Sequence, residues 1–334
     1  MVLLPKIELH VHLDCSLSFS AVQEMVPSIS ESEYRQKLIG PVKCRDLSHY
    51  LECAQFSVGL LQSKNNLRIA VFDLLKQQKE DRIIYSEIRF SPFEHIKGGL
   101  DPEEVVVTVL ESIKEASILF GIKSNVILCT LRHYPEAYSR KTADLAIAYA
   151  NEGIVGFDLA SDEANYPLDA HFKAFQKVKE HGLSTTAHAG EAAGAISVWE
   201  TLEKLTPNRI GHGVRAVEDS KLIEYLAHHQ IHLEVCPSSN IQTNVFEQYP
   251  DHVIDYLIEC GVSTSINSDA RTITDIHLRE EYQKLFNNFK WDIRQFYHCN
   301  LEAIKHAFID QKEKNRLTGI IKKGYEGYLA KDKS

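Results

Sequence analysis

The sequence lacks the features that mark membrane, nucleic-acid-binding or secreted proteins. No apolar run approaches the roughly 20 residues that a membrane span needs, and no dense run of Lys and Arg accompanies the net charge of -9. This balance argues against a nucleic-acid backbone or an anionic lipid surface as partner. The first residues show no signal-peptide pattern. We therefore expect a cytoplasmic protein whose partners are small molecules, and the sequence carries no signal for its oligomeric state.

Cysteine is present but shows no motif spacing. The chain has 7 cysteines in 334 residues, with no C-x-x-C pair, which favours reduced thiols over a disulfide framework or a cysteine metal site. The hydrophobic content of 44% is that of a globular protein with an ample core. Nothing in the composition marks a domain boundary, so we expect residues 1–334 to form a single domain.

Strand-like runs alternate with helical patterns along the chain. The eight runs are centred on His10, Ile84, Val126, Val155, Thr186, Ile210, Leu233 and Ser265. Such alternation requires parallel strands with right-handed crossovers, and eight units close into a (β/α)8 TIM barrel of the α/β class. The rival, an open doubly wound sheet, needs a Gly-rich first turn, which is absent. We expect extra helices after the first strand, from about residue 18 to 78, and at the C-terminus.

Helix-terminus signals support one of these crossovers. Asp101 precedes Pro102 and is expected to cap a helix that Gly121 ends. The pattern is typical of a long helix between two strands.

Four of the expected strands deliver ionisable groups at their carboxyl ends. His10 and His12 lie on one face of the first strand, His188 ends the fifth, His212 the sixth, and Asp269 follows the eighth. In a barrel these ends converge on the face where active sites lie. Three imidazoles and one carboxylate suit Zn²⁺ and leave a position for a water whose pKa falls towards about 7. We expect one zinc per chain, held by His10, His12, His188 and Asp269.

Glu191 is the candidate acid or base. It stands three residues after His188, where we expect a helix to start, and is not needed as a ligand. A glutamate in a first helical turn is also favoured by the helix dipole alone. The neighbouring metal histidine favours the catalytic interpretation.

Six segments over nearly the whole chain match a known pattern in order and spacing. They are His10-Val11-His12-Leu13-Asp14, Glu87-Ile88-Arg89-Phe90-Ser91-Pro92, Asp158-Leu159-Ala160 with Asp162-Glu163, His188-Ala189-Gly190-Glu191, Gly211-His212-Gly213, and Glu234-Val235-Cys236-Pro237-Ser238-Ser239-Asn240. With the late Asp269 they resemble the adenosine and AMP deaminase family of metal-dependent amidohydrolases. The Pro-Cys-x-x-Cys motif of cytidine-type deaminases is absent.

The resemblance implies zinc-dependent hydrolytic deamination of adenosine to inosine and ammonia. It implies that Glu191 protonates purine N1, and that His212 orients and deprotonates the attacking water beside Asp269. It also implies that Asp14 faces the ribose 5′-hydroxyl, although an aspartate here also suits a simple turn cap. Ser161 stands where the family has a glycine whose N–H approaches purine N3.

Three departures leave the substrate open. Cys15 and Ser161 replace glycines of the family pattern, and Ala270 followed by Arg271 replaces a residue that meets purine N7. The alternatives are an adenosine modified at the 5′ position or at N6, free adenine, and a purine-binding or partner-binding protein with little turnover. Another amidohydrolase reaction is disfavoured because no lysine stands at a strand end.

Overall fold

The centre of the structure is one parallel sheet of eight strands. The computed structural model describes residues 4–329, and its strands follow one another in chain order, each hydrogen-bonded to the next. The strands are β1 (Lys6–His12), β2 (Ile83–Phe90), β3 (Lys123–Leu131), β4 (Ile154–Ala160), β5 (Ser184–Ala189), β6 (Arg209–His212), β7 (His232–Val235) and β8 (Thr264–Ile266). Every expected strand is confirmed, and all neighbouring pairs are parallel.

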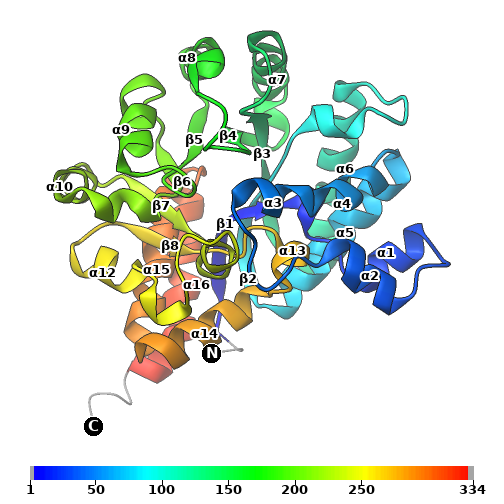
Figure 1. Ribbon diagram of the computed structural model, residues 1–334. Coiled ribbons are helices and arrows are strands. Elements are labelled where there is room, and N and C mark those ends of the chain that lie inside the picture. Colours follow the sequence, from blue (N-terminus) through cyan, green and yellow to red (C-terminus); the bar gives the residue numbers. More distant parts are fainter. Residues whose placement is uncertain (1–3, 330–334) are drawn as a thin grey trace.

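Helices surround the strands, as Figure 1 shows. They are α1 (Phe19–Met25), α2 (Glu31–Leu38), α3 (Leu47–Glu52), α4 (Ala54–Leu60), α5 (Lys64–Glu80), α6 (Pro102–Phe120), α7 (Glu136–Ala148), α8 (Phe172–Glu180), α9 (Ala195–Lys204), α10 (Ser220–His229), α11 (Pro237–Gln242), α12 (Ile254–Glu259), α13 (Arg271–Thr274), α14 (Leu278–Phe289), α15 (Ile293–His306) and α16 (Gln311–Leu329). The extra helices after the first strand are α1 to α5, and those at the C-terminus are α14 to α16. The α/β barrel is confirmed.

The barrel closes between β1 and the residues that follow β8. The Asp269 N–H donates to His10 O at 3.1 Å, and the His12 N–H donates to Asp269 O at 2.9 Å. These two bonds form a parallel bridge between Val11 and Asp269. Backbone pairing alone therefore places Asp269 beside both histidines of the first strand.

The expected cap of α6 is present in full. The Asp101 side chain accepts the Glu104 N–H at 2.8 Å, and the Glu104 carboxylate accepts the Asp101 N–H at 3.2 Å. Gly121 ends the helix with φ of 69°, a left-handed conformation that glycine adopts without a Cβ penalty. A cap of this kind stabilises a helix by about 1 kcal/mol.

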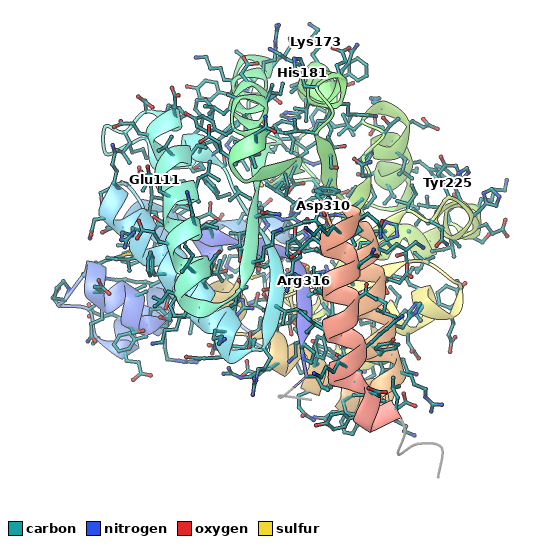
Figure 2. The ribbon with its side chains drawn as sticks, turned by 180° about the vertical axis from the view of Figure 1, so that it is seen from behind. Glu111, Lys173, His181, Tyr225, Asp310 and Arg316 are labelled. Carbon is teal, nitrogen blue, oxygen red and sulfur yellow. The ribbon has the colours of Figure 1, made fainter. Side chains whose placement is uncertain are left out.

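Two short helices, α11 and α13, are not predicted by the sequence. They contain 6 and 4 residues, too few to set a periodic apolar pattern. Both follow strands of the barrel, and in Figure 1 α13 and α3 lie in front of it. Figure 2 shows the opposite side, where α16, which carries Arg316, lies in front. The face that holds α3 and α13 is the one at which the strands end.

All seven cysteines are free, as their scattered spacing predicts. Between residues 4 and 329, no helix is long and apolar enough to cross a membrane.

Candidate active site

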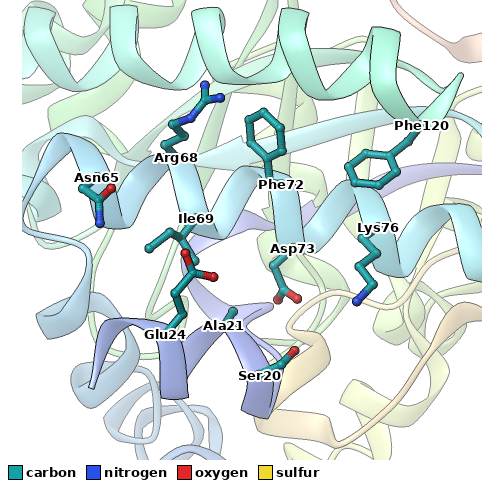
Figure 3. Close-up of a pocket in the computed structure, with 10 residues that line it drawn as sticks. All are labelled: Ser20, Ala21, Glu24, Asn65, Arg68, Ile69, Phe72, Asp73, Lys76 and Phe120. Atoms are coloured by element: carbon teal, nitrogen blue, oxygen red, sulfur yellow. The ribbon is translucent and has the colours of Figure 1, made fainter. Parts of the chain in front are cut away.

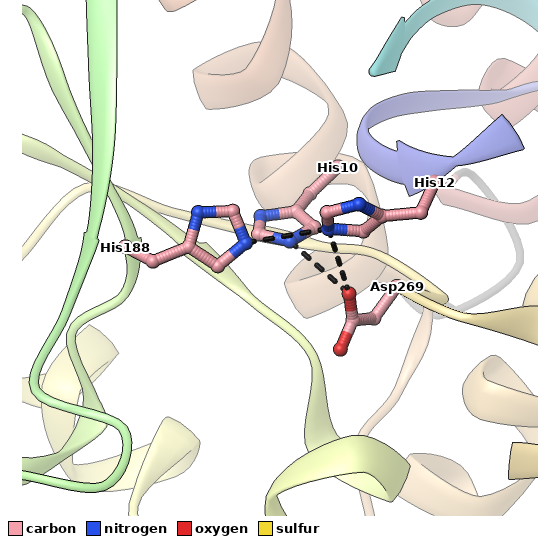
Figure 4. A group of neighbouring side chains, drawn as sticks. All are labelled: His10, His12, His188 and Asp269. Atoms are coloured by element: carbon pink, nitrogen blue, oxygen red, sulfur yellow. Dashed lines mark hydrogen bonds and ion pairs between the residues drawn. The ribbon is translucent and has the colours of Figure 1, made fainter. Parts of the chain in front are cut away.

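Four possible metal-ligand atoms converge at the carboxyl ends of β1, β5 and β8. His10 Nε2 and His12 Nε2 lie 3.2 Å and 3.3 Å from Asp269 Oδ1. His12 Nε2 also lies 3.3 Å from His188 Nε2. Figure 4 shows the three rings meeting beside the carboxylate, and all four ligand atoms lie within 4.8 Å of one another. The fold thus brings together the four residues that the sequence singles out.

Buried carboxylates fix the far side of two of these rings. His10 Nδ1 lies 2.9 Å from Glu234 Oε2, and His188 Nδ1 lies 3.2 Å from Asp158 Oδ1. Arg89 joins these carboxylates, with its Nη atoms 2.9 Å from Asp158 and 2.6 Å from Glu234. An ionised carboxylate only accepts hydrogen bonds, so both rings hold a proton on Nδ1 and direct the Nε2 lone pair into the cluster.

The cluster has the chemistry of a cation site. His10 Nε2 is buried and has no hydrogen-bond partner among the described residues. The Nε2 lone pair of His10 faces an Asp269 oxygen that has only lone pairs to offer, and that of His188 faces His12 Nε2. Converging acceptors in a buried site are stabilised by a cation between them, and carboxylate-oriented histidines are typical of metal ligands. These residues fit a metal of the zinc type.

Three candidate site residues have a left-handed backbone. The φ angles are 61° at His212, 60° at Asp269 and 83° at Ser161. Such a conformation costs a non-glycine residue about 1–3 kcal/mol and tends to persist at functional sites. At position 161 this conformation suits the glycine of the family pattern, which adopts such a φ without strain, better than the serine of this chain.

Glu191 lies on an irregular turn after β5, and the expectation that a helix starts there is wrong. Helix α9 begins four residues later, because Gly190, with φ of 69°, turns the chain first. The Glu163 carboxylate holds this turn by accepting the backbone N–H groups of residues 190–193 at 2.6–3.0 Å. Glu163 is therefore the residue that positions Glu191.

The Glu191 side chain is buried in surroundings that favour its neutral form. Its Oε1 has no hydrogen-bond partner among the described residues, and its Oε2 lies 3.5 Å from His212 Nε2. Burial, and then the negative charges of Asp269 and Glu163, raise the pKa of Glu191 well above its usual value. A protonated carboxyl in this position is able to give a proton to a bound molecule.

The unexpected helix α11 supplies two hydrogen bonds to the site. Ser239 Oγ donates to Asp269 Oδ2 at 2.6 Å, and Asn240 Nδ2 lies 3.1 Å from His212 Nδ1. These bonds fix the free oxygen of Asp269 and the outer nitrogen of His212. Sequence reasoning missed both functions, because they depend on contacts across 30 and 28 residues of sequence.

Two connected sets of residues line the space above the cluster. An inner cavity of about 60 Å³ is bounded by Glu191, His212, Asp269 and Ala270. An outer cavity of about 610 Å³ is lined by Asp14 and by polar residues at the entrance. The two cavities share five lining residues: His12, Cys15, Leu51, Ala54 and Ser161. The site therefore has a narrow reactive end and a wide outer end.

Asp14 and Arg271 have different surroundings. Asp14 Oδ2 lies 3.5 Å from the buried His95 Nε2, and His95 Nδ1 lies 3.1 Å from Leu61 O. Burial opposes the charge of Asp14, yet the contact with His95 holds its pKa below the usual value. Arg271 is buried against Glu8, 2.8 Å away, and does not line either cavity.

A separate hollow of about 450 Å³ lies between α1 and α5 (Figure 3). Its Asp73 carboxylate already accepts hydrogen bonds from Ser18 and Gln77 at 2.6–2.9 Å. Arg68 lies over the Phe72 ring at 4.3 Å. Asp73 and Arg68 thus find their partners within the protein. We place the functional site at the strand ends, where the candidate residues converge.

The supporting residues that sequence reasoning missed carry one recognisable signal. Arg89, Asp158 and Glu234 are charged residues inside strands, and all three are fully buried. Charged residues are almost never fully buried unless they are paired. Their position in β2, β4 and β7 therefore indicates a network inside the barrel, although the sequence does not reveal which charges pair.

The chain is similar to known proteins over nearly its whole length. The adenosine deaminase family model matches residues 5–324. An adenosine deaminase of Clostridium acetobutylicum is 34% identical over 321 residues, covering 94% of this chain and 96% of the relative.

Solved structures share the fold. An adenine deaminase from Arthrobacter aurescens gives a TM-score of 0.89 at 23% identity, covering 96% of this chain and 99% of the other. An amidohydrolase from Burkholderia ambifaria with bound zinc gives a TM-score of 0.88 at 20% identity, covering 98% and 93%. The sequence match over nearly the full length shows that the chain belongs to the adenosine deaminase family.

Proposed function

We propose that this protein is a hydrolase that converts adenosine to inosine and ammonia. The observation that carries the proposal is one inner cavity in which the buried carboxyl of Glu191, whose Oε1 has no hydrogen-bond partner among the described residues, meets His212 and the His–Asp cluster. Membership of the adenosine deaminase family supports the reaction class. A protein that only binds purines has no need of a protonated carboxyl beside such a cluster.

We propose zinc as the metal, held by His10, His12, His188 and Asp269. When bound, such an ion acts as a Lewis acid that makes a water molecule reactive at neutral pH. The donor set and the oriented histidines support this choice. So does the zinc bound to the amidohydrolase of the same fold.

The residues of the inner cavity move protons on two sides of the purine. Glu191 gives its proton to the ring nitrogen beside the carbon that is attacked, because addition there places negative charge on that nitrogen. His212 and Asp269 flank the water and hold it in place, and one of them receives its proton. Water exclusion by the buried walls strengthens each of these interactions.

The outer cavity has room for a sugar attached to the purine. A free purine would occupy the reactive end and leave the larger outer space unfilled. Asp14 lines that space with a charged carboxylate, which accepts a hydrogen bond from a hydroxyl. We propose that Asp14 binds the 5′-hydroxyl and that the backbone at Ser161 faces the base.

The test is the turnover of three related compounds, followed by ultraviolet absorbance. Adenosine should give the highest kcat/KM, and 5′-deoxyadenosine and free adenine should both be poorer. A site built to bind a hydroxyl can reject an analogue without it by up to about 10⁴–10⁵-fold. Equal or better turnover of 5′-deoxyadenosine or adenine contradicts the assignment of the substrate.

Metal analysis tests the cofactor separately. The purified protein should contain about one zinc per chain, and His188→Ala should lose metal and activity together because three donors remain. Active protein that contains no metal and has met no chelator would overturn the proposal.

A further inference from the structure

We propose that Asn240 and His252 are positioning residues that hold the proton of the His212 ring on Nε2. His212 then meets the attacking water as a hydrogen-bond donor. The role of the water rests on the proposed function, whereas the position of the proton rests on hydrogen-bond geometry alone.

His252, Asn240 and His212 form a chain of hydrogen bonds, and a backbone N–H at the His252 end determines which atoms donate and which accept. The Ile254 N–H donates to His252 Nδ1 at 3.1 Å. A ring nitrogen that accepts carries no proton, so His252 holds its proton on Nε2. His252 Nε2 lies 3.3 Å from Asn240 Oδ1 and donates to it.

The orientation of the Asn240 amide then determines which nitrogen of His212 carries the proton. Because its oxygen accepts from His252, its amide nitrogen is the donor that lies 3.1 Å from His212 Nδ1. His212 Nδ1 is therefore an acceptor, and the ring proton is on Nε2. That nitrogen faces the inner cavity, 3.5 Å from Glu191 Oε2.

Burial protects the chain of bonds from exchange with water. Asn240, His252 and His212 are 0%, 3% and 1% exposed. Burial also lowers the pKa of His252 to about 3, which keeps this ring neutral. The Phe246 ring packs on His252, with centroids 4.9 Å apart.

The proton position gives His212 and Asp269, which flank the attacking water, different functions. With a proton on Nε2, His212 donates a hydrogen bond to the water oxygen and cannot accept the water's proton through that nitrogen. Of the two groups that flank the water, Asp269 is then left as the acceptor. His212 acts by holding the water in place.

Nitrogen-15 NMR of histidine-labelled, metal-loaded protein reads the proton position directly. The His212 signals are identified by their loss in His212→Gln. In the parent we expect a protonated Nε2 and an unprotonated Nδ1. In Asn240→Asp the new carboxylate accepts from Nδ1, and the proton should move there.

Kinetics show whether the proton position matters for turnover. We expect Asn240→Asp to lower kcat at least about tenfold, with KM changed less than about threefold. His252→Phe should lower kcat several-fold, and His252→Gln, whose amide is able to donate to Asn240, should recover most of it. Asn208→Asp is the matched control, because an aspartate there still accepts the Thr185 N–H and kcat should stay unchanged.

The outcomes separate this proposal from the proposed function. A protonated Nδ1 of His212 in the parent overturns the inference even if adenosine is turned over. If adenosine is not turned over, the NMR result still decides the proton position. A kcat for Asn240→Asp within twofold of the parent, at equal metal content, overturns the role in catalysis.

Discussion

Two buried glutamates, one inside the barrel and one in the inner cavity, have pKa values shifted in opposite directions. Glu234 is fully buried, as Glu191 nearly is, and burial alone raises the pKa of any carboxyl. For Glu234 the guanidinium groups of Arg89 and Arg209 outweigh burial and hold the pKa well below its usual value. Glu191 has no such cation, and its pKa is raised. Partners, not depth, decide which carboxyl is an anchor and which is a proton donor.

The first test exchanges the Glu191 carboxyl for an amide. Glu191→Gln should lower kcat by about 10²–10⁴-fold, because an amide cannot deliver a proton to the ring nitrogen. It should keep its metal and its free energy of unfolding, since no cation loses a partner. Metal analysis, urea denaturation and steady-state kinetics check this. Turnover within about tenfold of the parent is incompatible with the role as proton donor.

The same exchange at Glu234 should act on stability. Glu234→Gln removes the charge that faces Arg209 Nε at 2.6 Å and Arg89 at 2.6 Å. Breaking a buried pair of this kind costs about 3–5 kcal/mol of unfolding free energy. Urea denaturation measures it. Glu136→Gln, which removes an exposed partner of Lys173, is the matched control and should cost less than about 1 kcal/mol. An equal effect of both variants contradicts the comparison.

The buried histidine His171 shows how the pKa of a buried group makes stability depend on pH. Burial lowers the pKa of His171 from 6.5 to about 4. Between these values the unfolded chain binds the proton and the folded protein does not. The stability linked to this group is thus full above pH 6.5 and is lost as the pH falls towards 4, by up to about 1.4 kcal/mol per pH unit. In His171→Gln the slope of unfolding free energy against pH, measured by urea denaturation, should be shallower in this range. An unchanged slope would contradict the lowered pKa of His171.

The smallest expected effect is at Ser161. Its φ of 83° is unfavourable for a side chain, so Ser161→Gly should stabilise the protein by about 1 kcal/mol. The gain is reduced by the extra freedom of glycine in the unfolded chain. Thermal unfolding measures it, and a clear loss of stability would mean that the serine side chain makes a favourable contact.

The sequence predicts the parts of the site that lie on strands. His10, His12 and His188 follow from their positions in short apolar runs, and the parallel barrel brings them together with Asp269 without further information. The turn that holds Glu191 does not follow, because it depends on the Glu163 carboxylate 28 residues away in sequence. Contacts between distant irregular segments leave no periodic pattern.

The supporting network is only partly visible in the sequence. Charges within strands indicate that Arg89 and Glu234 need partners, but the pairing depends on which strands face each other across the barrel. Asn240 and His252 lie in a six-residue helix and just before another short helix, where propensity carries little information. Their functions come from three-dimensional contacts alone.

The central claim is that Glu191 is protonated while Glu234 is ionised in the same folded protein. The most direct test is the infrared difference spectrum between the metal-loaded parent and Glu191→Gln at neutral pH. We predict that the parent contributes the carbonyl band of a protonated carboxyl, which disappears in the variant. Loss of the paired bands of an ionised carboxylate instead would contradict the account.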